Sequence, residues 1–374
     1  MPLKCEEPGP VQLPLGKVIG KRWKIIQKLG QGGCGAVFMV EDVRTQSKAA
    51  LKAESNFVAG GSVLKLEAQV LQRMKGKKFV AQLLHAGRKE RYCYMVMTLL
   101  GLSVEKLFHR CHKEFTVSTQ VRIGIHVLFG IKQLHEVGYV HRDVKPANLA
   151  LGLKGRETKI VHMLDFGLAR EYITRTNGRV EMRREREKTL FRGTTRYCSL
   201  NTHARNEQGR PDDLWSLLYV LAEMRGRLPW SHLREKKDIG KSKAATSDIR
   251  LLAKCPVQML DLPKHLRQLG YYTRPDYLLI YRCLSGILTT YGFKFMDPYD
   301  WETRMESPKS KKSKITTVFS KIRSIEDTSG EKTLEVGTSG CKGTVETEPT
   351  AEDNNGEEEP LYKEEDFAKN EIGF

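Results

Sequence analysis

Two short motifs bring together the residue types that phosphoryl transfer requires. The first reads His141-Arg142-Asp143-Val144-Lys145-Pro146-Ala147-Asn148, and seventeen residues after it comes Asp165-Phe166-Gly167. Asp143 can accept the proton of an attacking hydroxyl group, and Lys145 can steady the transferred phosphate. Asn148 and Asp165 carry oxygen atoms of the kind that Mg²⁺ prefers as ligands. We therefore interpret the two motifs as one phosphoryl-transfer site rather than as an unrelated loop and turn.

A glycine cluster precedes these motifs and reads Leu29-Gly30-Gln31-Gly32-Gly33-Cys34-Gly35-Ala36-Val37. The same glycine spacing occurs in dinucleotide-binding folds, where the glycines open a helix. Here strand-like sequence flanks the cluster over residues 23–43, so we predict that the glycines join two strands. Such a hairpin can cover nucleotide phosphates, and every residue of the cluster except Ala36 is a candidate contact. A glycine-rich hairpin without function is the alternative.

The next two predicted elements supply a lysine and a glutamate. Lys52 lies in the apolar strand of residues 49–54, and Glu67 lies on the apolar stripe of a helix that begins after the candidate cap Ser62. A carboxylate on an apolar face is costly unless it is paired, which favours Lys52 as the partner of Glu67. A cation so placed can reach nucleotide phosphates. For Lys52 taken alone, an exposed lysine is the alternative.

Two further positions complete the candidate site. Met97 ends an apolar strand and would lie behind the adenine, whose edge the backbone from Thr98 to Leu100 would contact. Ordinary core packing is the alternative for Met97. Thr194 follows the segment that starts at Asp165, and we expect it to bond toward Asp143 and Lys145 as the floor for a substrate hydroxyl.

Composition limits the classes of protein that fit. The 374 residues include eight scattered cysteines without a Cys-x-x-Cys pair, which indicates free thiols in a reducing compartment and disfavours a zinc site. The first fourteen residues hold no apolar run, and no segment approaches eighteen apolar residues, so we expect neither a secretory signal nor a membrane span. The expected location is the cytoplasm, with the nucleus as the alternative.

Charge is distributed unevenly along the chain. The net charge is +18, but residues 346–374 carry eleven acidic residues against two lysines, a net charge of −9, so the remainder carries +27. A field this positive favours anionic partners such as acidic or phosphorylated proteins, nucleic acid or anionic lipid, without choosing among them. No motif specifies a nucleic acid. We also hypothesise that the acidic end folds back onto the basic body and competes with acidic substrates.

The remaining organisation is a leader, a helical half and a tail. Residues 1–17 are rich in Pro and Gly, helical periodicity dominates from about residue 106, and residues 211–221 predict a helix buried on all sides. Residues 302–374 turn first basic and then acidic, with few large apolar residues, and we predict that they are disordered.

The order of these motifs resembles the eukaryotic protein kinase family over residues 20–301. Ser199-Leu200-Asn201 and Gly226-Arg227-Leu228-Pro229-Trp230 resemble the casein kinase I superfamily. Phe191-Arg192-Gly193-Thr194, Tyr272-Thr273-Arg274-Pro275-Asp276-Tyr277 and Tyr299-Asp300-Trp301-Glu302 are most similar to its tau-tubulin kinase branch. The resemblance implies an α+β fold with a kinase domain over residues 18–301. A small β-rich lobe (about 20–97) would stand over a larger helical lobe (about 101–301), with ATP between them.

By this resemblance each motif takes a role. Gly30, Gly32 and Gly35 would cover the phosphates of ATP, and Lys52, paired to Glu67, would contact them. The base would be Asp143, with Lys145 neutralising the phosphoryl charge, Asn148 and Asp165 binding Mg²⁺, and Asp213 tying the catalytic loop to the core. A basic pocket for acidic or phosphorylated determinants would include Arg196, Gly226 and Arg234. A structural ion pair is the alternative for Arg196.

The chain departs from the family pattern at two places. The stretch between Arg170 and Arg192 is strongly basic, and Leu218 fills a position that is commonly Gly. Neither departure removes a catalytic group, but both make substrate preference hard to transfer from relatives.

The sequence therefore predicts an ATP- and Mg²⁺-dependent serine/threonine protein kinase that prefers acidic or phosphorylated sites. Its partners would be protein substrates, with tubulin or tau-like proteins suggested by the resemblance alone. One alternative is a pseudokinase that acts as a scaffold or microtubule-associated binding module. It is disfavoured because a degenerate kinase typically lacks at least one of the catalytic groups assembled above. A small-molecule phosphotransferase is disfavoured because residues 193–201 offer a floor for a peptide.

Overall fold

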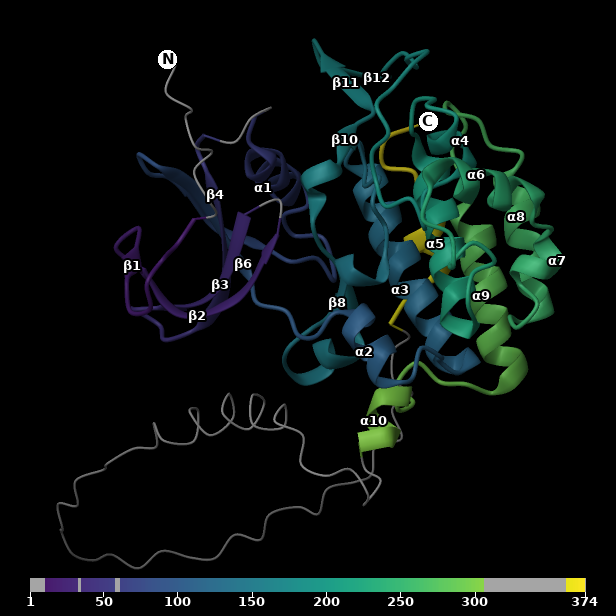
Figure 1. Ribbon diagram of the computed structural model, residues 1–374, viewed down its shortest axis with the longest axis horizontal. Coiled ribbons are helices and arrows are strands. Elements are labelled where there is room, and N and C mark those ends of the chain that lie inside the picture. The colour runs from purple at the N-terminus through teal and green to yellow at the C-terminus, as the bar shows by residue number, and fades with distance from the viewer. Residues whose placement is uncertain (1–10, 33–34, 58–60, 306–360, 374) are drawn as a thin grey trace, which may run out of the picture. The chain divides into compact units, whose positions relative to one another are not determined.

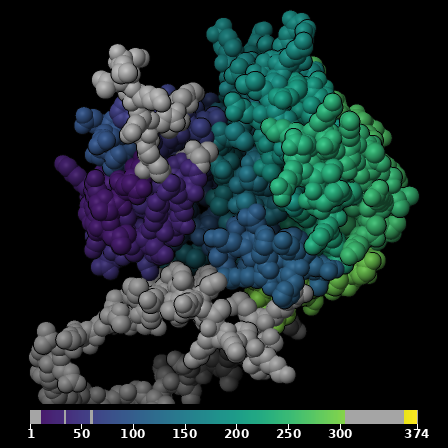
Figure 2. All heavy atoms as spheres, in the orientation of Figure 1, coloured from purple at the N-terminus to yellow at the C-terminus, as the bar shows by residue number. Residues whose placement is uncertain are grey.

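The computed structural model describes residues 11–32, 35–57, 61–305 and 361–373 (Figure 1). The chain as far as Trp301 forms one compact unit together with the residues from Tyr362 onward. This unit contains a β-rich lobe and a helical lobe, as the sequence predicts, and Figure 2 shows the same division in space-filling form.

The N-terminal lobe is built on one antiparallel sheet with the strand order β1-β2-β3-β4-β6-β5. Its strands are β1 (Val18–Ile19), β2 (Trp23–Gly32), β3 (Gly35–Asp42), β4 (Lys48–Ser55), β5 (Leu83–Arg88) and β6 (Tyr92–Thr98). Trp23, Phe38, Val40 and Leu51 form its core, against which Leu13 of the predicted leader also packs. Six consecutive residues of β4 are buried, so the position of Lys52 on this central strand is fixed by packing on both sides of it.

Helix α1 (Val63–Arg73) is the only α-helix in the described part of this lobe, and it follows β4. Its start is fixed by Ser62, whose side chain accepts a hydrogen bond from Lys65 N at 3.1 Å, as the cap prediction requires. Glu67, Val70 and Met74 are buried, which confirms the predicted inward stripe and turns Glu67 toward the sheet.

The second lobe is mainly helical. Its helices within the described residues are α2 (Val104–Arg110), α3 (Val117–Glu136), α4 (Leu200–His203), α5 (Arg210–Arg225), α6 (Lys236–Ala245), α7 (Asp248–Leu251), α8 (Asp261–Leu266), α9 (Tyr277–Tyr291) and α10 (Asp300–Met305). Both α3 and α5 are buried nearly all round, which explains their continuous apolar sequence and confirms the prediction for residues 211–221. Pro211 lies in the first turn of α5, where its missing N–H costs nothing.

Short strand pairs hold the loops that carry the two motifs. The hairpin of β8 (Leu149–Leu151) and β9 (Val161–Met163) follows the first motif and precedes the second, and Leu164 N donates to Asn148 O at 2.8 Å. Strand β7 (Tyr139–Val140) pairs with β10 (Arg170–Glu171), so the start of the first motif lies beside the end of the second. The two motifs are therefore held together at both ends.

A hairpin that the sequence reading missed lies in the basic stretch after Arg170. It consists of β11 (Ile173–Thr176) and β12 (Arg179–Met182). Asn177 and Gly178 join them, with φ values of 51° and 76°, the left-handed conformation that a tight two-residue hairpin turn requires. An Asn-Gly pair is a recognised signal for a hairpin turn, but most of the flanking residues are charged or polar, so the usual apolar pattern of strands is weak.

The prediction of a disordered tail over residues 302–374 is wrong for residues 302–305, which belong to α10, and for the last part of the tail. Residues 306–360 lie outside the described residues. Residues 361–373, however, include helix α12 (Glu364–Ala368), and Tyr362 and Phe367 are buried against the helical lobe. Two aromatic side chains within six residues supply apolar surface that the overall polarity of the tail concealed.

Candidate active site

Lys52 joins the two lobes through two carboxylates. Its Nζ lies 2.6 Å from Glu67 Oε2 on α1 and 3.3 Å from Asp165 Oδ1 in the helical lobe. Lys52 and Glu67 are buried, whereas the Asp165 side chain keeps 39% of its exposure. The predicted Lys52–Glu67 pair is therefore formed, and it points at the second motif.

The charges of this group favour an ionised Asp165. Burial acts to raise its pKa, but the positive charge and the hydrogen bond of Lys52 contribute to outweighing this effect, and the pKa lies below its ordinary value. Burial raises the pKa of Glu67, and the charge of Lys52 acts in the opposite direction. At neutral pH Asp165 is thus a carboxylate with one oxygen near Lys52 and exposed surface left for another cation.

Asp143, Lys145 and Thr194 form a closed triangle. Asp143 Oδ1 accepts hydrogen bonds from Thr194 N at 2.8 Å and Thr194 Oγ1 at 2.6 Å. Lys145 Nζ donates to Asp143 Oδ2 at 2.6 Å and to Thr194 Oγ1 at 3.0 Å. The structure therefore brings together three groups that the sequence spreads over fifty residues, in the arrangement that we expected for Thr194.

Asn148 is oriented with its amide nitrogen toward the catalytic loop. Its Nδ2 donates to Asp143 O at 3.0 Å and to Asp143 Oδ2 at 3.3 Å, which leaves its side-chain oxygen for another partner. The donor set of Asn148 and Asp165 consists of amide and carboxylate oxygen. This fits Mg²⁺, which takes one or two protein oxygens and completes its shell with water and phosphate. Among the described residues no cluster of three or more His, Cys, Asp or Glu is arranged for a metal.

The backbone of the first motif is fixed from below by Asp213 on α5. Its carboxylate accepts His141 N at 2.7 Å and Arg142 N at 2.8 Å, and it lies 2.9 Å from His135 Nε2. Arg142 and Asp165 have left-handed φ values of 67° and 63°, a strain that persists only where surrounding bonds hold it. Asp213 has the position predicted for a residue that ties the loop to the core.

Gly193 shows why the segment before Thr194 needs glycine. Its φ is +107°, and an added Cβ would lie 2.4 Å from Arg142 O. Only a residue without a side chain lets this backbone approach the first motif closely enough for Thr194 to reach Asp143.

The glycine cluster forms the predicted junction between two strands. Gly30 and Gln31 lie on β2 opposite Val37 and Ala36 on β3, and Leu29 is exposed. The register also places Val37 opposite Lys52, so the cluster leads directly to the lysine. The candidate residues Gly33 and Cys34 lie outside the described residues.

The expected adenine side lies at the end of β6. Met97 is buried there, opposite Ala50 of β4 and Leu83 of β5. Thr98 N donates to Gln82 O at 3.0 Å, so this amide is engaged within the protein. The Thr98 amide, which belongs to the backbone stretch expected to contact the adenine edge, is therefore not available as a hydrogen-bond donor to adenine.

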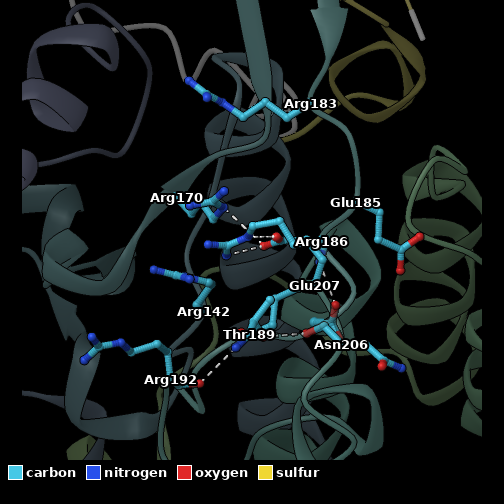
Figure 3. A network of polar contacts seen from close by, with 12 residues as sticks. Arg142, Arg170, Arg183, Glu185, Arg186, Thr189, Arg192, Asn206 and Glu207 are labelled. Atoms are coloured by element: carbon cyan, nitrogen blue, oxygen red, sulfur yellow. Dashed lines mark hydrogen bonds and ion pairs between the residues drawn. The ribbon is translucent and has the colours of Figure 1, made fainter.

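A network of arginines surrounds one buried acid beside the catalytic loop (Figure 3). Arg170 Nε forms an ion pair with Glu207 Oε1 at 3.1 Å, and Arg186 Nη2 donates to the same carboxylate at 3.0 Å. Burial acts to raise the pKa of Glu207, but Arg186, Arg170 and Arg142 together lower it. Burial, together with the charge of Arg170, lowers the pKa of Arg142 to about 10. Glu207 thus supplies the negative charge that organises this segment.

Arg196, one of the residues of the predicted anion pocket, forms an ion pair within the protein. Arg196 Nη1 lies 2.6 Å from Glu223 Oε1, and Tyr197 Oη donates to the same carboxylate at 2.5 Å. The alternative that the sequence left open, a structural ion pair, describes this residue. An added Cβ on Gly226 would lie 3.1 Å from Lys254 Cδ, and Arg234 is exposed.

Glu207 and Glu223 are the residues that sequence reasoning missed. A signal existed for Glu223, because it is an acid within the apolar helix α5 and so required a partner, by the same argument that identified Glu67. For Glu207 the local sequence gives no comparable signal.

Known proteins that are similar to this chain in sequence agree with the architecture described above. Residues 23–277 match the model of the protein kinase domain. The chain belongs to the protein kinase family. A Caenorhabditis elegans protein whose name describes a serine/threonine-protein kinase is 49% identical over 310 residues, covering 82% of this chain and 90% of its own length. A Dictyostelium discoideum protein named in the same way is 36% identical over 294 residues, covering 78% of this chain and 59% of its own length.

For this protein kinase, the matches confirm the two-lobed fold and the enzyme class expected from the sequence, a protein serine/threonine kinase. No helix in the described part of the kinase combines the length and the hydropathy needed to cross a bilayer.

Proposed function

We propose that the kinase transfers the γ-phosphoryl group of ATP to serine and threonine hydroxyls, with Mg²⁺, and that Asp143 is its base. The main support for the proposal is that the candidate residues form two sets of contacts. Lys52, Glu67 and Asp165 form one set of contacts, and Asp143, Lys145 and Thr194 form the other, with Asn148 bonded to Asp143.

In this mechanism the side chains act by position and charge. Asp143 orients the substrate hydroxyl and accepts its proton, and Thr194 keeps the Asp143 carboxylate aimed at the hydroxyl. Lys145, already 2.6 Å from Asp143, offsets the negative charge on the phosphoryl group in transit. Lys52 holds the other phosphates, and Glu67 prevents it from turning away.

Asn148 and Asp165 would hold Mg²⁺, which neutralises phosphate charge when it is bound. The support is the orientation of the two side chains, since the nitrogen of Asn148 is used by Asp143 and the pKa of Asp165 is lowered. On the adenine side, Met97 would pack behind the ring. Because the Thr98 amide already donates to Gln82 O, we expect the adenine edge to form its hydrogen bonds with the Thr98 carbonyl and the Leu100 backbone.

A preference for acidic or phosphorylated substrate sites is part of the proposal. Its support is a set of exposed basic side chains in the segment that leads to Thr194, namely Arg175, Arg179, Arg184, Lys188 and Arg192. Arg192 lies two residues before Thr194, next to the place where a substrate hydroxyl would bind. Since Arg196 is neutralised by Glu223, we assign the preference to these exposed residues and not to a pocket centred on Arg196.

We also propose that this segment is organised without a phosphate on Thr189. Arg170 and Arg186 already have an acidic partner in Glu207. Thr189 Oγ1 donates instead to Asn206 O at 3.0 Å. The Thr189→Ala enzyme is therefore expected to keep most of its activity, whereas a required phosphate at this position would make it inactive.

Membership of the casein kinase I superfamily, and of its tau-tubulin branch, remains a proposal supported by residues 199–201 and 226–230. In the structure Ser199 caps α4, and Asn201 Nδ2 donates to Glu207 O at 2.9 Å. Tubulin or tau-like substrates rest on the resemblance alone. The cytoplasmic location stays a prediction, and the cysteines in the described residues form no disulfide with one another.

The test is transfer of radiolabelled phosphate from ATP to a peptide library that presents Ser, Thr or Tyr with acidic, neutral or basic flanks. We expect labelled Ser and Thr peptides with acidic flanks and no labelled Tyr peptides. Lys52→Met, which removes the phosphate cation, is the inactive control. A purified, folded kinase that labels no peptide would favour the scaffold alternative, and equal labelling of acidic and neutral flanks would remove the substrate preference.

A further inference from the structure

The last residues of the chain dock on the helical lobe as a peptide would. Helix α12 packs on α9 and α3, and the segment lies against the helical lobe as the yellow stretch of Figure 1. Tyr362 keeps 3% of its exposure and Phe367 keeps none. The docked segment, residues 361–373, is thus anchored by two aromatic side chains that are five residues apart.

Each anchor has its own site. The Tyr362 ring lies 5.0 Å from Phe129 and 5.7 Å from Phe79, and its hydroxyl lies 2.5 Å from His126 Nδ1. The Phe367 ring stacks on Tyr281 of α9 at 4.1 Å, with an angle of 11° between the rings. Aromatic rings packed in this way give both apolar burial and a defined geometry.

Charges fix the direction of the docked segment. Arg282 on α9 donates twice to Glu364, at 2.8 and 2.6 Å. Glu136, the buried last residue of α3, accepts the backbone amides of Glu371 at 2.5 Å and Ile372 at 3.2 Å. Arg274 donates to Glu136 at 3.1 Å and to Lys369 O at 2.9 Å. A buried carboxylate that receives these donors is well satisfied while the segment is bound.

The docked segment also contacts parts of the molecule that carry the active site. Phe79 and Lys77, which forms an ion pair with Glu371, lie in the loop between α1 and β5, directly after the helix that holds Glu67. Next to Glu371, Ile372 packs against the cluster of Val140, Tyr172 and Ile173, and Val140 directly precedes His141 of the first motif. The segment therefore contacts the support of Glu67 and the support of Asp143 at the same time.

We propose that the surface formed by α3 and α9 is a peptide-docking site whose occupant is the kinase's own C-terminal segment, residues 361–373. Its occupation holds the α1–β5 loop and the root of the catalytic loop in the active arrangement. The site takes an acidic peptide with aromatic residues at its second and seventh positions. Release of the segment lowers phosphoryl transfer, because the Lys52–Glu67 contact observed here is formed with the segment bound. This inference rests on the catalytic roles proposed above for Glu67 and Asp143.

The covalent connection makes this occupant the favoured one. A segment tethered to its own site is present at a high local concentration, so it docks in preference to a free peptide of the same sequence. When its anchors are removed, the vacated surface becomes available to a peptide supplied in trans, which gives the proposal a direct test.

The experiment uses the full chain with Tyr362→Ala and Phe367→Ala together. Amide hydrogen exchange followed by mass spectrometry reports docking, and kcat/KM with an acidic peptide reports coupling to the active site. We expect exchange at least ~10-fold faster in residues 361–373 and in residues 75–82, and kcat/KM at least ~5-fold lower. A synthetic peptide of residues 360–374 should restore kcat/KM and slow exchange in residues 75–82, whereas residues 361–373 of the variant itself should still exchange fast. The matched control is Tyr291→Ala, an exposed aromatic residue at the end of α9.

A second variant distinguishes release of the docked segment from misfolding of the double variant. Glu371→Lys leaves both aromatic anchors in place and reverses only the charge opposite Lys77, so faster exchange is expected in residues 75–82 without loss of the global fold.

Two results would overturn the inference. Residues 361–373 that stay protected in the double variant would show that the two rings are not the anchors. A released segment with unchanged kcat/KM and unchanged exchange in residues 75–82 would show that docking and activity are not coupled. Failure of the proposed catalytic function is distinct, because the parent chain would then transfer no phosphate while exchange still reported docking.

Discussion

Thr194 gives the sharpest test of the geometry around the proposed base. Its hydroxyl donates to Asp143 Oδ1 at 2.6 Å and accepts from Lys145 at 3.0 Å. Valine has the same shape without the hydroxyl, so Thr194→Val removes both bonds and leaves the backbone bond from Thr194 N at 2.8 Å. A hydrogen bond to a charged group contributes about 1.5–3 kcal/mol. If this stabilisation aims the base, kcat should fall by about 10- to 100-fold.

The assay is steady-state transfer to a Ser peptide with ATP varied. KM for ATP should stay within about 3-fold, because Thr194 lies on the substrate side of Asp143. Thr194→Ser is the matched control, since it keeps the hydroxyl and should retain near-parental kcat. Equal thermal midpoints of the two variants would exclude a folding defect. A Thr194→Val enzyme as fast as its parent would refute the idea that this hydroxyl orients the base.

Three further predictions follow from the same contacts. Asp165→Asn should raise the Mg²⁺ concentration for half-maximal transfer by about 10-fold or more, because a charged ligand becomes neutral; a Mg²⁺ titration measures this, and an unchanged midpoint contradicts the metal assignment. Glu207→Gln should lower the free energy of unfolding in urea by about 1–3 kcal/mol, because Arg170 and Arg186 lose their acid, whereas Glu185→Gln at an exposed position should not. Burial lowers the pKa of His126 from 6.5 to about 3, so the stability that its neutral form contributes is present above pH 6.5 and is lost as the pH falls toward 3. Near pH 5 this loss is about 2 kcal/mol, and His126→Gln should flatten the corresponding slope in urea unfolding.

The parts of the fold that could be predicted are those fixed by local chemistry. Ser62 begins α1 because its hydroxyl caps the helix, and Glu67 faces inward because it shares the apolar stripe. The glycine cluster could be placed between strands because its flanks alternate in the manner of strands. These signals lie within a few residues of one another, so one sequence is enough to interpret them.

The features that could not be predicted depend on contacts between residues that are distant in sequence. Arg196 could be an anion site or one half of an ion pair, and only the fold brings Glu223 to it. The C-terminal segment looked disordered because acidic and polar residues dominate its composition. Its order comes from Tyr362 and Phe367 meeting rings on α3, α9 and the α1–β5 loop, more than eighty residues away. Composition describes the average of a segment, whereas docking here depends on two side chains.

The role of Asp143 as the base is tested by the kcat of Asp143→Asn, a variant that keeps the shape of the side chain and removes its ability to accept a proton. Loss of a general base predicts a fall in kcat of about 10²- to 10⁴-fold with Ser or Thr peptides, while KM for ATP changes little. A folded Asp143→Asn enzyme that transfers phosphate at the parental rate would contradict the role of Asp143 and the site built around it.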